Sequence, residues 1–216
     1  MNYLIDKLIM VPMVLAALVF HELAHGWVSG KLGDPTPKIT GRMTLNPLAH
    51  LEPIGAVLMI FTGFGWAKPV EINPRYYKNP KKGMALTALA GPLANLALSI
   101  AAFIIYGIIY IIYEKTGFFA NSIFSITGLL WRFVTLNLSF MVFNFIPIPP
   151  LDGSRILGLF LSDRAYFKIQ EYERYSFILI ILLSASGAFD AIITGGVSTI
   201  FYNMLSVFSK LMTMVV

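Results

Sequence analysis

The sequence has 216 residues, of which 57% are hydrophobic and only 12% are charged. A soluble globular domain carries about 25% charged residues, so the composition excludes an ordinary soluble enzyme and indicates an integral membrane protein. The net charge is +5, but the basic residues lie between apolar runs as topology signals, and no nucleic-acid partner is expected. There is no cysteine, which excludes disulfides and thiolate ligands to a metal.

The N-terminal part holds one span and two shorter elements. The apolar run over residues 4–30 exceeds the roughly 20 residues that a helix needs to cross the hydrocarbon core. Residues 38–45 alternate polar and apolar side chains in places, which predicts a short strand whose edge could pair with an unwound substrate. An ordinary surface hairpin is the alternative. The apolar run over residues 54–66 is too short to cross and favours a re-entrant or interfacial segment.

The rest of the chain adds further spans, predicted over residues 84–113 and 126–147. The stretch 177–216 holds one or two more, with breaks expected near Gly187 and again at Gly195-Gly196. The predicted fold is therefore an all-α, multi-span helical bundle with a small re-entrant or β-hairpin element. Residues 1–216 form one membrane-embedded domain, with a three-helix catalytic core within about 4–153 and peripheral helices over about 174–216.

The loop charges predict the orientation of a multi-pass cell-membrane protein. Basic residues gather in 31–82 and 151–175, whereas the loop around Glu114-Lys115 has a single one. Basic loops stay on the cytoplasmic side, so the N-terminus is expected outside. Residues 1–20 also resemble a secretory signal, but Asp6 and the polar residues that follow at 21–25 do not fit one.

The first span contains the sequence His21-Glu22-Leu23-Ala24-His25, an HExxH motif. Positions four apart share one helix face, so both imidazoles can point at one metal ion, and Glu22 can serve as general base toward water. A charged residue at mid-depth costs on the order of 2.5–3.5 kcal/mol, and a bound metal would offset that cost. The alternative is a set of packed polar side chains with internal hydrogen bonds.

A third ligand is needed, because catalytic zinc usually takes three protein ligands and one water. Asp152 is favoured because it closes a Pro-rich run, where a regular helix stops at membrane depth. The alternative is that Asp152 only caps the helix that follows. The remaining candidates are His50, Glu52 and Glu71.

Three motifs together resemble the site-2 protease family of intramembrane zinc metalloproteases: HELAHG at 21–26, AGPLANL at 90–96 and NFIPIPPLDG at 144–153. The segments 46–55 and 65–70 resemble its compact prokaryotic branch. The resemblance covers most of residues 15–175 and implies that Asp152 is the third zinc ligand. It also implies cleavage of membrane-embedded or membrane-proximal segments, with an active site that opens toward the cytoplasm.

The sequence departs from many members of that family in two places. Residues 114–125 leave no room for an inserted PDZ-type domain, and the end at Val216 leaves none for a cystathionine-synthase-like domain. These departures affect the expected gating and regulation of the enzyme, and leave the expected chemistry unchanged.

Three more polar residues are candidates for contacts with the substrate. Asn95, after Gly91-Pro92, could donate to the developing oxyanion, as could Asn144, although interhelical hydrogen bonds are the alternative for both. His50 could touch the metal site or the substrate, or lie in a polar interfacial loop. The predicted function is a zinc metalloendopeptidase that acts on membrane proteins in the lipid bilayer, with a metal transporter or a catalytically silent scaffold as rivals.

Overall fold

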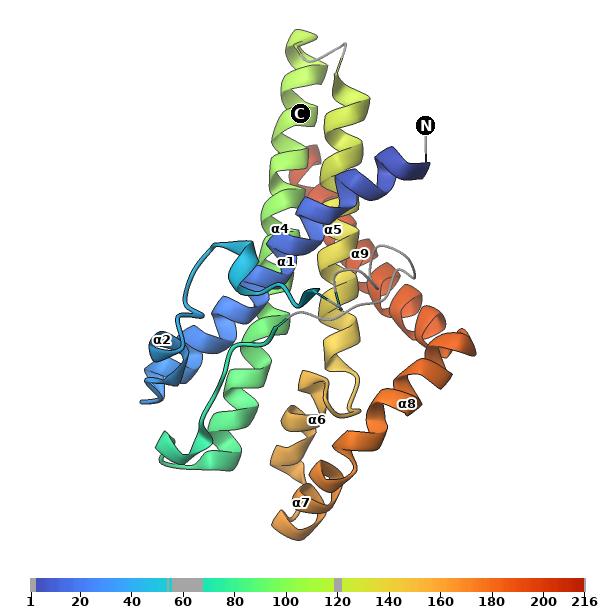
Figure 1. Cartoon of the computed structure of the whole chain (residues 1–216). Helices are drawn as coiled ribbons and strands as arrows, with labels where there is room; N and C mark the ends of the chain where they lie inside the picture. Colours follow the sequence, from blue (N-terminus) through green and yellow to red (C-terminus); the bar gives the residue numbers. More distant parts are fainter. Residues whose placement is uncertain (1–2, 54, 56–67, 119–121, 216) are drawn as a thin grey trace. The chain divides into compact units, whose positions relative to one another are not determined.

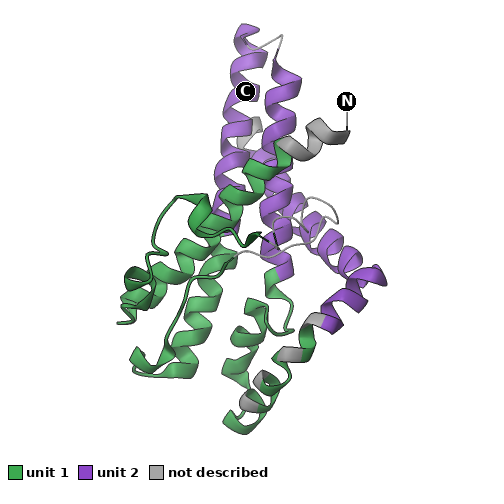
Figure 2. Cartoon of the chain, viewed as in Figure 1, with its two compact units in different colours: residues 1–94, 144–177 green, residues 95–143, 178–216 purple. Residues whose placement is uncertain are grey.

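The structure is a computed structural model that describes residues 3–53, 55, 68–118 and 122–215. The chain divides into two compact units, each built from two separate stretches (Figure 2). Unit 1 comprises residues 1–94 and 144–177, and unit 2 comprises residues 95–143 and 178–216.

The described ranges are mostly helical, which confirms the predicted helical class (Figure 1). The α-helices in chain order are α1 (Tyr3–Lys31), α2 (Thr36–Ile39), α4 (Pro80–Thr116), α5 (Ile123–Phe145), α6 (Asp152–Leu157), α7 (Asp163–Glu171), α8 (Glu173–Ala185) and α9 (Ala188–Val215). Single 3-10 turns lie at Pro47–Ala49 (η1), Pro74–Tyr76 (η2) and Gly158–Phe160 (η3).

Four helical segments of the described chain are long and apolar enough to cross a membrane: Ile9–Lys31, Pro80–Thr116, Ile123–Phe145 and Ala188–Lys210. The first three coincide with the spans predicted from the sequence. Large apolar side chains such as Ile104 and Ile108 stay exposed on α4. An exposed apolar face suits a helix that meets hydrocarbon, because lipid imposes no cost on apolar surface.

The C-terminal region contains one of the two predicted breaks. Gly187 adopts a left-handed φ of +74° and separates α8 from α9, as expected. The break predicted at Gly195-Gly196 is wrong, because α9 continues through both residues. A Cβ atom at Gly196 would lie 2.8 Å from the side chain of Val142. Within unit 2, this glycine therefore serves close packing of α9 on α5 and does not end the helix.

Unit 2 has an apolar core formed by α4, α5 and α9. Its buried members are Ala102, Phe103, Val134, Leu138 and Phe201. Phe201 also meets the ring of Trp131 edge-on, with centroids 4.4 Å apart. Aromatic pairs in this geometry add stability beyond the area they bury.

In unit 1, the chain after α1 differs from the prediction. The strand predicted over residues 38–45 is wrong: residues 36–39 form the single turn of α2, and turns and loop follow it. Pro35 has a φ of −80°, which favours a helical turn, and Asp34 Oδ1 accepts a hydrogen bond from the N–H of Thr36. The re-entrant segment predicted over residues 54–66 lies almost entirely outside the described residues.

Candidate metal centre

Two histidines of α1 face one another inside unit 1. His21 and His25 are both buried, and their Nε2 atoms are 2.9 Å apart. The rings meet edge-on, with centroids 4.5 Å apart. This is the geometry expected of residues four apart on a helix, with both imidazoles directed at one point.

The carboxylate of Asp152 reaches the same point. Its Oδ2 lies 3.2 Å from Nε2 of His21 and 3.2 Å from Nε2 of His25. Asp152 is the first residue of α6, after Leu151 in an extended conformation. Gly153 allows this turn, because a Cβ atom there would lie 2.5 Å from the carbonyl carbon of Phe145. The glycine of the predicted LDG motif therefore has a steric role in placing the aspartate.

The hydrogen bonds of His25 determine which of its nitrogens can bind a cation. Nδ1 lies 2.7 Å from the carbonyl oxygen of Thr87, and a carbonyl only accepts, so Nδ1 carries the proton. In the neutral ring, Nε2 then presents its lone pair to His21 and Asp152. Nearly every histidine that ligates a metal has its second nitrogen fixed in this way.

The three donor atoms fit a divalent cation such as zinc. They all lie within 4.8 Å of one another, and ligand atoms of a tetrahedral zinc are about 3.3 Å apart. Asp152 Oδ2 is buried and, despite its short distances to both rings, makes no hydrogen bond. One proton cannot satisfy a carboxylate and two facing ring nitrogens at once. A metal ion would satisfy all three.

Glu22 stands beside His21, and its carboxylate is fixed by a backbone group. The N–H of Val70 donates to Oε2 of Glu22 over 2.8 Å. One oxygen is thus held by the segment that precedes α4, and the carboxylate retains further lone pairs for another donor.

Of the other predicted residues, Asn95 and His50 each make a side-chain hydrogen bond outside the cluster of donor atoms. Asn95 belongs to unit 2, where its Nδ2 donates to Oδ1 of Asn137 over 3.0 Å, in agreement with the interhelical alternative. Asn144 lies half-buried near the end of α5. His50 is buried and its Nε2 lies 2.9 Å from the carbonyl of Thr44. Glu52 accepts from the N–H of Gly55, so of the candidates for third ligand only Asp152 joins the two histidines.

Two residues near the histidines have no counterpart in the prediction. Thr87 acts through its backbone carbonyl, which carries no sequence signature. Ser29 follows His25 by four positions on α1 and is fully buried. Its place on the stripe His21, His25, Ser29 is the one signal from which its involvement could have been predicted.

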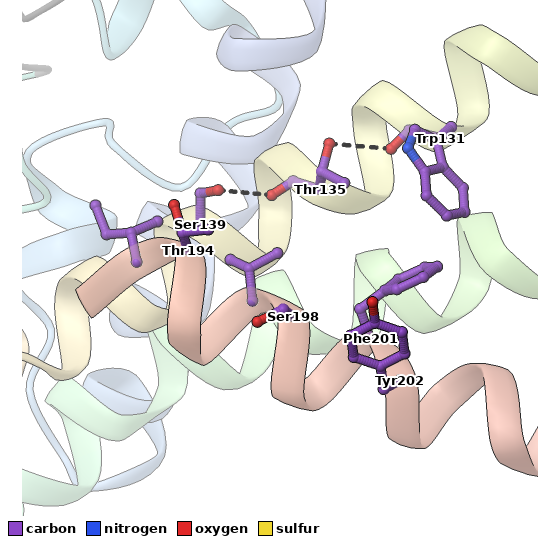
Figure 3. A pocket seen from close by; sticks show the side chains of 9 residues that line it. Trp131, Thr135, Ser139, Thr194, Ser198, Phe201 and Tyr202 are labelled. Atoms are coloured by element: carbon purple, nitrogen blue, oxygen red, sulfur yellow. Dashed lines mark hydrogen bonds between the residues drawn. The ribbon is translucent and has the colours of Figure 1, made fainter. Parts of the chain in front are cut away.

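A separate groove lies in unit 2, between α5 and α9, with a volume of about 350 Å³ (Figure 3). Trp131, Phe201 and Tyr202 supply most of its aromatic surface. Thr135 and Ser139 also line it, but their hydroxyls donate to backbone carbonyls one turn earlier in α5. The groove therefore offers apolar surface and few ligand atoms, unlike the cluster in unit 1.

Comparison with known proteins identifies the family. YwhC of Bacillus subtilis, named as a putative zinc metalloprotease, is 38% identical over 176 residues, which cover 79% of this chain and 77% of YwhC. A sequence model of peptidase family M50 matches residues 105–186, a range that includes Asp152. The chain belongs to peptidase family M50.

Other relatives of this M50 peptidase differ more in length. Rip2 of Mycolicibacterium smegmatis, with a similar name, is 24% identical over 185 residues, or 82% of this chain and 66% of Rip2. Zinc metalloprotease MJ0392 of Methanocaldococcus jannaschii is 32% identical over 164 residues, which cover 76% of this chain but only 38% of the relative. No solved structure shows a significant match. The prediction of a zinc metalloprotease of the site-2 protease family is confirmed. The four apolar helices of the described residues indicate a multi-pass membrane protein.

Proposed function

We propose that this M50 peptidase hydrolyses peptide bonds in or near transmembrane segments of other membrane proteins, at a zinc ion held by His21, His25 and Asp152. The observation that carries the proposal is the convergence of three buried donor atoms within 4.8 Å beside Glu22. The residues 4–30, 84–113 and 126–147 form the catalytic core. The other predicted contacts, of Asn95, Asn144 and His50 with the substrate, remain predictions.

The side chains divide the chemistry between them. Zinc, when bound, polarises a carbonyl group and lowers the pKa of water. Glu22 takes the proton from the attacking water and returns it to the leaving amine. Because Val70 N–H holds Oε2 of Glu22, the carboxylate stays oriented between the two transfers. Asp152, His21 and His25 would hold the ion through the carboxylate oxygen and the ring nitrogens that converge in the structure.

The orientation follows from the charges of the loops. Eight Lys and Arg residues lie in 31–82 and four in 151–175, and basic loops stay on the cytoplasmic side. The N-terminus then lies outside. The centre of the HExxH motif is eight residues before Lys31, about 12 Å along the helix axis, so the site lies within the membrane, nearer its cytoplasmic face.

The rival functions are not favoured. A metal transporter needs no glutamate beside the first histidine, and a silent scaffold needs no complete set of ligands. Membership of a peptidase family and the convergence of the three donor atoms both favour hydrolysis.

The decisive experiment replaces Glu22 by Gln, which keeps the shape of the side chain but cannot accept a proton near neutral pH. Membrane proteomes of cells with the wild-type protein, Glu22→Gln and a matched control, the exposed Glu71→Gln, are compared. We expect membrane precursors to accumulate only with Glu22→Gln. The rate of peptide-bond hydrolysis by this variant should fall on the order of 10²–10⁴-fold, and its zinc should be retained. Undiminished cleavage by zinc-loaded Glu22→Gln would refute the mechanism.

A further inference from the structure

We propose that Tyr77 is a positioning residue for the metal ligand His25, because its hydroxyl joins α1 to α4 one helical turn from the metal centre. This inference rests on the proposed zinc site. Tyr77 lies between η2 and α4 in unit 1 and is buried. It does not belong to the predicted ligand set, and it follows Tyr76, whose side chain is exposed.

A chain of hydrogen bonds runs from the loop after α1 to α4. The hydroxyl of Ser29 donates to Oδ2 of Asp34 over 2.7 Å. Tyr77 Oη lies 2.7 Å from Oγ of Ser29 and 3.1 Å from Oγ1 of Thr87. The backbone carbonyl of the same Thr87 accepts from Nδ1 of His25. Tyr77 is therefore the bridge between a residue of α1 and the residue of α4 that orients His25.

The carboxylate of Asp34, at one end of this series of hydrogen bonds, determines which hydroxyl donates in each bond. A hydroxyl has one hydrogen, and that of Ser29 goes to Asp34, so Tyr77 must donate to Ser29. The oxygen of Tyr77 then accepts from the hydroxyl of Thr87. Burial raises the pKa of Tyr77, which keeps this donor protonated. Each of the three hydroxyls thus has one defined partner to donate to.

The surroundings hold Tyr77 in one place. Ser29, Asp34 and Thr87 are each at most 2% exposed. Gly83 gives the tyrosine ring its space, because a Cβ atom there would overlap the ring. Asp34 also accepts from the N–H of Asn73 over 2.8 Å, which ties the segment before Tyr77 to the same carboxylate. Hydrogen bonds buried in this way are costly to leave unmade.

The consequence for the metal comes from the geometry of two helices. Ser29 lies four residues after His25, about 6 Å along α1. The Tyr77 bridge sets the position of α1 against α4 at that level, and so sets the distance from His25 Nδ1 to the Thr87 carbonyl. That hydrogen bond in turn fixes the imidazole, and loss of such support costs about 10–100-fold in metal affinity.

The test measures zinc affinity of the purified full chain in detergent, by competition with a chromogenic chelator. Tyr77→Phe removes the hydroxyl and keeps the ring against Gly83, and Tyr76→Phe is the matched control. We expect zinc affinity to fall about 10–100-fold in Tyr77→Phe and to stay at the wild-type value in Tyr76→Phe. Replacement of zinc by Co²⁺ should also give a shifted visible absorption spectrum in Tyr77→Phe and an unshifted one in Tyr76→Phe.

A second pair of variants tests the same link from α4. Thr87→Ser keeps the hydroxyl and should keep wild-type affinity, whereas Thr87→Val removes it and should match Tyr77→Phe. The double variant Tyr77→Phe/Thr87→Val should be no weaker than Tyr77→Phe alone, because the bond that Thr87→Val removes is already lost in Tyr77→Phe. If Tyr77→Phe fails to fold, the comparison of Thr87→Ser with Thr87→Val tests the proposal in its place.

The outcomes separate this inference from the proposed function. Wild-type affinity and an unchanged Co²⁺ spectrum in both Tyr77→Phe and Thr87→Val would overturn the positioning role and leave the zinc site intact. A wild-type protein that binds no zinc would overturn the zinc site itself, and the positioning role with it.

Discussion

Gly91 of α4 lies so close to His21 of α1 that no side chain fits between them. A Cβ atom on Gly91 would stand 2.5 Å from Cε1 of His21 and 2.5 Å from Nε2 of His25. Contacts under 3.0 Å are essentially never made by real Cβ atoms. The absent side chain therefore leaves open the space where the two ring nitrogens meet Asp152.

Gly91→Ala should for this reason displace the imidazoles and abolish tight zinc binding. We expect zinc content after purification to fall well below one ion per chain, and proteolysis to be lost with it. Gly128→Ala on α5 is the matched control, since nothing lies within 4 Å of its added methyl group. Metal analysis of the two proteins checks the prediction, which is wrong if Gly91→Ala retains a full complement of zinc.

Asp152→Ala should lose most of the bound zinc, because it removes one of three protein ligands. Asp163→Ala and Glu52→Ala should keep it: the Asp163 side chain is 81% exposed and pairs with Lys81, and Glu52 accepts from a backbone N–H. Zinc per chain is measured by atomic emission on protein purified in detergent. Full retention of zinc in Asp152→Ala would reopen the search for the third ligand.

Asp34 should make the protein sensitive to acid. Burial raises the pKa of this carboxyl, but hydrogen bonds from Thr36, Asn73 and Ser29 outweigh it and hold the pKa below its usual range. Since the unfolded value is about 3.9, the stability that Asp34 contributes is complete above that pH and is lost as pH falls toward the folded value.

The check compares thermal unfolding of the wild type and Asp34→Asn in detergent between about pH 7 and pH 3. We expect the wild type to unfold at the higher temperature near neutral pH, and the difference to shrink below about pH 4. A difference that stays constant over the whole range would show that the charge of Asp34 contributes nothing.

The orientation can be tested directly, because the chain contains no cysteine. Single cysteines replace three exposed residues, Lys78, Thr116 and Lys168. With an impermeant thiol reagent added outside intact cells, we expect Thr116→Cys to be labelled and the other two to be protected until the cells are opened. The reverse pattern would place the N-terminus in the cytoplasm.

The sequence predicts the parts of the site that depend on local spacing. His21 and His25 are four residues apart, so helical geometry alone brings them together, and the structure has them 2.9 Å apart at Nε2. Asp152 is far away in the chain and could be placed only from its Pro-rich setting and a family resemblance. The structure supplies the steric reason, which is the contact of Gly153 with the Phe145 carbonyl.

The supporting contacts could not be predicted, for physical reasons. The Thr87 carbonyl is a backbone group that every residue has, so no side-chain pattern marks it. Tyr77 reaches Ser29 only because Gly83 leaves space for its ring, a packing relationship that spacing does not encode. The wrong prediction of a helix break at Gly195-Gly196 has a related cause. Glycine ends a helix in one context and allows close packing in another, and the sequence alone does not show which applies.

The three residues proposed to hold the metal come from α1 and α6, with α4 and α5 between them in the chain. During synthesis α1 leaves the ribosome first, and Asp152 follows only after most of the protein has been made. A nascent chain that ends before Asp152 therefore lacks one of the three proposed ligands, whatever the supply of zinc. If the three residues hold zinc as proposed, a newly made chain has no hydrolytic activity until Asp152 has joined the two histidines.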